Sequence, residues 1–145
     1  MYPVKTNLLT ANRSHKPLKP QGIVLHSTAT KGATDDAEVR YFNTHPERQA
    51  SAHAFIDLDS ISLAVPVNEK AWHAGATANS RFLEIELCEP GGNNPAQFKE
   101  VWNRAVWYFS YLYIYVLKIN TVTKENLMSH AEVSAKWHET DHKTR

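Results

Sequence analysis

The sequence predicts one α/β domain in which helices flank a mixed central β-sheet. Short apolar or alternating segments occupy the first two thirds of the chain, and one long segment with helical spacing follows them. A strand, a helix, several strands and then a long helix are typical of an α/β sandwich. With 145 residues, 42% of them hydrophobic, the chain can bury one core of ordinary size.

The N-terminal part is predicted to be an irregular arm, with the folded domain beginning after it. Residues 1–21 contain Pro3, Pro17 and Pro20 among polar residues, a composition that interrupts regular structure. We therefore divide the chain into an arm, residues 1–21, and a domain, residues 22–145.

The first predicted strand and helix of the domain follow directly. Ile23–Leu25 is short, apolar and β-branched, which fits a buried strand, and His26 stands at its end. Thr34 can cap a helix that continues at helical spacing to about Thr44, where Pro46 closes it.

The remaining elements are a hairpin, a strand and a long helix. Residues 52–57 and 61–65 flank a turn, and residues 82–87 alternate between apolar and acidic side chains. From Phe98 onward, apolar residues recur with a helical period to about Leu117, so this helix is expected to pack on a sheet of at least four strands.

Charge and composition exclude several functions. Lys+Arg 16 against Asp+Glu 15 leaves a net charge of +1, which favours neither nucleic acid nor an anionic membrane. The single cysteine, Cys88, cannot form an internal disulfide and is expected to be a small buried residue. The first residues lack a secretory signal, and Val106–Ile119 is too short and periodic to span a membrane. We expect a monomer that is made in the cytoplasm.

The eight histidines are the unusual feature, because histidine is the commonest metal ligand. His26 ends a strand, and His130 follows a segment that can return to the sheet; either one alone is more often an ordinary core residue. The tail adds His138, Asp141 and His142, each able to complete a tetrahedral zinc site with an open position for water. The pattern favours metal-assisted hydrolysis, since zinc makes a bound water nucleophilic near neutral pH.

Two other groups have both a structural and a functional interpretation. Glu84 and Glu86 share one face of their strand, which is either a solvated face or a source of a general base. Trp72 and His73 lie in a loop of small residues, which is either a packed turn or a substrate-contacting loop.

Five segments together resemble the type 2 N-acetylmuramoyl-L-alanine amidases, a family that includes phage endolysins, bacterial autolysins and peptidoglycan recognition proteins. In family order and spacing they are residues 23–29, 51–57, 71–75, 80–88 and 129–133. The resemblance extends from about Pro20 to the C-terminus. It implies an amidase-like single domain with a mixed sheet, one Zn²⁺ in a groove, and cleavage of the amide between N-acetylmuramic acid and L-alanine in peptidoglycan.

The resemblance also implies roles for individual residues. His26 and His130 match the zinc histidines, and Glu86 matches the catalytic glutamate. Glu84 stands where the family usually has glycine. The resemblance implies that His53 and His73 contact the substrate or support the metal's ligands, and we also expect Trp72 to contact the substrate.

The third zinc ligand has two matches in the tail. In one branch of the family it is an aspartate, which Asp141 matches, and this is our prediction. In the other branch it lies eight residues after the second histidine with a lysine two before it, which places His138 there with Lys136.

The sequence therefore predicts a zinc-dependent amidase that degrades the cell wall. The alternative is a peptidoglycan-binding protein without catalysis, as in family members that lack a complete metal site. A chain without a signal peptide suits a phage or prophage endolysin, a bacteriolytic enzyme that reaches the wall after release from the cytoplasm.

Overall fold

The computed structural model describes residues 1–92 and 94–142, and over these ranges six strands form one mixed sheet. Its order is β1-β4-β3-β5-β2-β6. The strands are β1 (Val4–Thr6), β2 (Ile23–Ser27), β3 (Ala54–Ile56), β4 (Ile61–Leu63), β5 (Leu83–Leu87) and β6 (Leu127–Ser129). The predicted mixed sheet, and each predicted strand within it, is confirmed.

The helices connect and cover these strands. They are α1 (Asp35–Thr44), η1 (Pro46–Arg48), α2 (Ala76–Asn79), α3 (Pro95–Tyr111), η2 (Leu112–Leu117) and α4 (His130–Trp137). The Thr34 side chain caps α1 as predicted, accepting from the Ala37 N–H. Helix α3 begins three residues before Phe98, because the Asn94 side chain caps it and Pro95 occupies its first turn.

The register of the central strands decides which side chains meet at the sheet's edge. Strand β2 pairs in parallel with both β5 and β6, and β5 pairs in parallel with β3. In this register His26 lies directly opposite Glu86. Because successive side chains of a strand alternate between faces, these two share one face.

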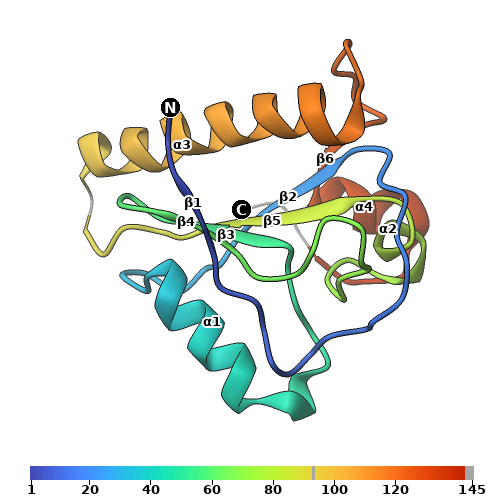
Figure 1. Cartoon of the computed structure of the whole chain (residues 1–145), viewed down its shortest axis with the longest axis horizontal. Coiled ribbons are helices and arrows are strands. Elements are labelled where there is room, and N and C mark those ends of the chain that lie inside the picture. Colours follow the sequence, from blue (N-terminus) through green and yellow to red (C-terminus); the bar gives the residue numbers. More distant parts are fainter. Residues whose placement is uncertain (93, 143–145) are drawn as a thin grey trace.

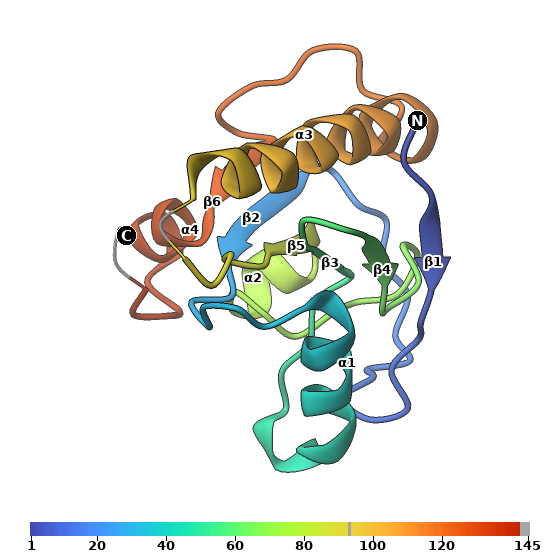
Figure 2. The same cartoon turned by 90° about the vertical axis from the view of Figure 1, so that its left-hand side faces the viewer.

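The long helix α3 covers the opposite face (Figures 1 and 2). Its buried positions Val101, Ala105, Tyr108 and Leu112 follow one stripe of the helix. They pack against strand residues such as Ile85 in the largest core cluster.

Helix α1 lies on the other side of the sheet from α3, and α2 and α4 lie near its β2–β6 edge (Figure 2). Val39 of α1 packs against Phe55, and Ala78 of α2 and Val133 of α4 pack against Val24. These shorter elements leave room between them for the polar side chains described below.

The N-terminal arm is more ordered than we predicted. Val4–Thr6 forms β1 and pairs in parallel with β4, and Leu9 and Leu18 are buried in the core. The prediction of an irregular segment over residues 1–21 is therefore wrong for these three strand residues. Across the described ranges, every helix is too short or too polar to traverse a lipid bilayer.

Candidate active site

The site begins with His26 and Glu86 at the carboxyl ends of neighbouring strands. Glu86 Oε1 lies 3.3 Å from Nδ1 of His26 and 3.4 Å from Nδ1 of His73. The carboxylate is mostly buried, so either imidazole can donate an N–H to it with little competition from water.

His130 reaches the same place from the start of α4. Ser129 and Glu132 form a capping box, in which the Ser129 hydroxyl accepts from the Glu132 N–H and the Glu132 carboxylate accepts from the Ser129 N–H. This box starts the helix directly after β6. It places the His130 ring 4.9 Å from the His26 ring, measured between centroids.

His142, from the tail after α4, completes a group of three histidines. Its Nε2 lies 2.5 Å from Nε2 of His26, and its ring stacks on that of His130 at a centroid distance of 4.3 Å. One nitrogen from each of the three rings falls within 4.8 Å of the others. All three line a cavity of about 260 Å³ together with Phe98 and Leu87.

A second group shares His26 and consists of His26, His73 and Glu86, with ligand atoms equally close together. The two groups are thus adjacent. One offers three imidazoles and the other places a carboxylate beside them.

The protonation states of these imidazoles suit a metal. Burial lowers the pKa of His130 to about 3, and it also lowers the pKa of His73. Both rings are therefore neutral near pH 7, which is the state that binds metal. Among the described residues nothing hydrogen-bonds the buried Nδ1 of His130, which leaves its lone pair for a ligand.

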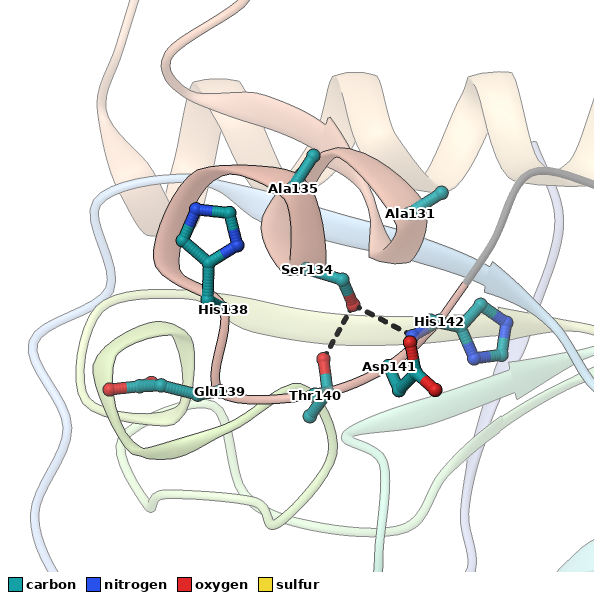
Figure 3. Close-up of a pocket in the computed structure, with 8 residues that line it drawn as sticks. All are labelled: Ala131, Ser134, Ala135, His138, Glu139, Thr140, Asp141 and His142. Carbon is teal, nitrogen blue, oxygen red and sulfur yellow. Dashed lines mark hydrogen bonds between the residues drawn. The ribbon is translucent and has the colours of Figure 1, made fainter.

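The third ligand expected from the sequence does not join this group. Asp141 and His138 are both exposed, and neither belongs to a cluster of possible ligands in the described part of the chain. Figure 3 shows His138 at one end of a pocket along α4 and His142 at the other. Residues 143–145, which follow Asp141 in the family-like tail, lie outside the described residues.

His53 does not lie where a substrate could touch it. Its side chain is fully buried, and Nε2 donates to the Glu69 carbonyl at 2.6 Å while Nδ1 accepts from the Glu84 N–H at 2.9 Å. Its burial lowers its pKa to about 4. Of the two roles expected for His53, substrate contact conflicts with this burial, whereas support of the metal's ligands stays a prediction; its hydrogen bonds join the start of β3 to β5 and to residue 69.

Trp72 and His73 fit the expectation of a substrate-contacting loop better. Both line a hollow of about 430 Å³, together with Gly75 and Asn79. The Asn79 side chain accepts from the N–H groups of His73 and Ala74 at 3.0 Å and so fixes the loop. His73 therefore stands between this hollow and Glu86.

Glu84 does not lie on a solvated strand face. It is fully buried, and neither carboxylate oxygen has a hydrogen-bond partner in the described residues. Burial raises its pKa well above the usual value, and the nearby Glu86 charge adds to this shift.

Sequence reasoning missed a further carboxyl group, Glu38 of α1. Burial raises its pKa to about 7, and the negative charge of Glu86 contributes. A signal was available, because Asp35, Glu38, Val39 and Phe42 have the i, i+3, i+4, i+7 spacing of one helix face. That spacing places Glu38 on the face that packs on the sheet.

Comparison with known proteins gives one family. A family model described as N-acetylmuramoyl-L-alanine amidase matches residues 16–143. Protein Ami of Listeria monocytogenes is 35% identical over 94 residues, which are 65% of this chain and 10% of Ami. The bifunctional autolysin of Staphylococcus aureus is 36% identical over 69 residues, 48% of this chain and 5% of the autolysin. The chain thus spans a tenth or less of these relatives.

Solved structures agree on the fold. The Staphylococcus aureus hydrolase AmiA, in complex with its ligand, aligns with a TM-score of 0.85 at 24% identity, covering 100% of this chain and 74% of AmiA. A mutant endolysin from Bacillus subtilis aligns with a TM-score of 0.80 at 28% identity, covering 94% of this chain and 88% of the endolysin.

Proposed function

The chain belongs to the N-acetylmuramoyl-L-alanine amidase family, and from this premise we propose that it is a zinc-dependent hydrolase of bacterial peptidoglycan. The bond cut is the amide between N-acetylmuramic acid and L-alanine. The observation that carries the proposal is the cluster of three histidines beside one buried glutamate.

His26, His130 and His142 are the proposed zinc ligands. Three imidazoles leave a fourth tetrahedral position open, as catalytic zinc sites do. Asp141, the ligand that the resemblance implied, is exposed and apart from this cluster, so His142 takes its place in the proposal. When bound, zinc supplies an acidic water and polarises the substrate carbonyl.

Glu86 is the proposed general base and acid. Its carboxylate accepts a proton from the attacking water as the new C–O bond forms at the amide carbonyl carbon. It then delivers that proton to the L-alanine nitrogen as the C–N bond breaks. The His26 Nδ1–H can donate to Oε1 and hold it in place, and Nδ1 of His73 lies 3.4 Å from the same oxygen.

Trp72 and His73 are proposed to contact the substrate. The Trp72 ring offers an apolar surface in the hollow beside the site, where sugar or peptide can pack. We propose that the protein acts at the cell wall, where it binds peptidoglycan.

Digestion of purified cell walls tests the proposal. With zinc present, we expect new N-terminal L-alanine and no new reducing sugar ends, and a chelator should stop the release. New reducing ends would make the protein a glycosidase. Binding to the wall without any new amino terminus would make it a binding protein only.

A further inference from the structure

The tail that carries His142 turns back along α4. His138 ends the helix in the left-handed region, with φ +57°, and its N–H donates to the Ser134 carbonyl at 2.9 Å. Thr140 and His142 then return to the side chain of Ser134 (Figure 3).

Two hydroxyl groups connect the tail with His130. The His142 N–H donates to Ser134 Oγ at 3.1 Å, and Ser134 Oγ lies 2.6 Å from Thr140 Oγ1. Thr140 Oγ1 lies 3.3 Å from Nε2 of His130. The backbone of one site histidine is therefore linked to the ring of another through the Ser134–Thr140 pair.

One tautomer of His130 is compatible both with these hydrogen bonds and with the absence of a partner at its Nδ1 among the described residues. If Nε2 carries the proton, it donates to Thr140 Oγ1, and the Thr140 hydroxyl can donate onward to Ser134 Oγ. Nδ1 then keeps its lone pair, and this is the buried atom without a hydrogen-bond partner among residues 1–92 and 94–142. A hydrogen bond from the nitrogen that does not bind the metal fixes both the tautomer and the orientation of a ligating histidine.

We propose that Ser134 and Thr140 are positioning residues, which hold His130 with its Nδ1 lone pair facing the site and hold His142 beside His26. The inference rests on the proposed zinc site for its consequence, but the tautomer itself is a property of the metal-free protein. Neither hydroxyl touches the substrate in this scheme.

A separate contact, which does not involve the hydroxyls of Ser134 and Thr140, also anchors the tail. The Glu139 carboxylate accepts from the N–H and from the hydroxyl of Thr77, both at 2.8 Å, and so caps the start of α2. Gly75, with φ +95°, allows this approach, because a Cβ there would lie 2.8 Å from Cβ of Glu139. Variants at Ser134 or Thr140 should therefore keep the tail attached.

The first test measures the His130 tautomer by ¹⁵N NMR in metal-free protein at pH 7.5. We expect the wild type to show a protonated Nε2 and a bare Nδ1. Thr140→Val keeps the shape of the side chain but lacks the hydroxyl, so it should lose this preference, whereas Thr140→Ser should retain it. A bare Nδ1 that persists unchanged in Thr140→Val would overturn the proposal.

The second test measures zinc affinity by competition with a chelator. Thr140→Val and Ser134→Ala should each weaken binding roughly 10- to 100-fold, while Thr140→Ser should stay close to the wild type. Ser110→Ala is the matched control, because this exposed α3 hydroxyl donates only to the Val106 carbonyl. Equal affinity of Thr140→Val and wild type would contradict the inference. If the wild type itself binds no zinc, the proposed function fails, and the NMR result still decides the role of the hydroxyl pair.

Discussion

The two faces of the sheet differ in the chemistry of their buried side chains, although the same strands supply both. Under α3 the strand residues are apolar, as in Ile23 and Ile85. On the opposite face, His26, Glu84 and Glu86 alternate with them along β2 and β5.

The contrast teaches that neighbouring residues of one strand have separate tasks. Burial of apolar area on the α3 face stabilises the fold. The polar face instead holds neutral imidazoles and carboxyl groups whose desolvation opposes folding. Substitutions on the two faces should therefore affect different measurements.

The largest expected effect is the loss of a proposed ligand on the polar face. His142→Ala should remove nearly all bound zinc and reduce hydrolysis to background, because two remaining imidazoles bind zinc much more weakly than three. Metal content by mass spectrometry and release of N-terminal alanine measure this effect. Asp141→Ala is the matched control and should keep its zinc, since that carboxylate is exposed. An Asp141→Ala protein without zinc, next to a zinc-loaded His142→Ala, would restore the aspartate as the ligand.

Glu86→Gln should be the next largest effect, with zinc retained and turnover lowered roughly 10²-fold or more. The amide keeps the shape of the side chain but cannot accept the proton of water. Steady-state kinetics on cell-wall fragments give the ratio to wild type. Glu84→Gln serves as the control on the same face and should change turnover much less, because burial raises the pKa of Glu84 and so favours the protonated form, which the amide resembles. The reverse order of effects would assign catalysis to Glu84.

Much of this contrast was predictable from the sequence. The run Ile23–Leu25 predicted a buried strand with His26 at its end, and the alternation over residues 82–87 placed Glu84 and Glu86 on one face. The spacing of apolar and polar side chains is a local property, so it can be read from neighbouring residues.

The rest depends on contacts between distant segments. No periodicity marks Val4–Thr6 as a strand, because three residues that pair with β4 carry too short a pattern. His142 reaches His26 because Ser134 and Glu139 hold the tail by hydrogen bonds, and such bonds leave no sequence period. Glu84 is buried and the backbone of Ala74 lies beside its carboxyl group, which strand alternation alone could not reveal.

On the apolar face, Ile85→Ala should act on stability and leave the chemistry intact. The side chain is 1% exposed within the core beneath α3, and truncating a buried isoleucine typically costs about 2 to 5 kcal/mol. Urea unfolding should show this loss. Zinc content and turnover, measured at a temperature where the variant is folded, should stay within about twofold of wild type, because the Ile85 side chain lies on the face opposite the site. A large fall in turnover of the folded variant would mean that the two faces are coupled.

The smallest expected effect is on the pH dependence of stability, and it comes from the buried Glu38 on the polar side of the sheet. Its folded-state pKa of about 7 lies above the ordinary value of 4.5, because the group is buried and faces the charge of Glu86. Between these two pKa values the native protein binds more protons than the unfolded chain, so this group makes stability fall as pH rises from about 4.5 to 7.

Glu38→Gln mimics the protonated carboxyl group and removes that dependence. The variant should match the wild type at pH 4 and exceed it at pH 8, by at most about 3 kcal/mol. Urea unfolding at pH 4, 5.5, 7 and 8 tests this, and Glu84 and Glu86 remain in both proteins, so the difference between the curves isolates Glu38. Parallel curves for the two proteins would mean that Glu38 is ionised at little cost, and that the polar face opposes folding less than its burial implies.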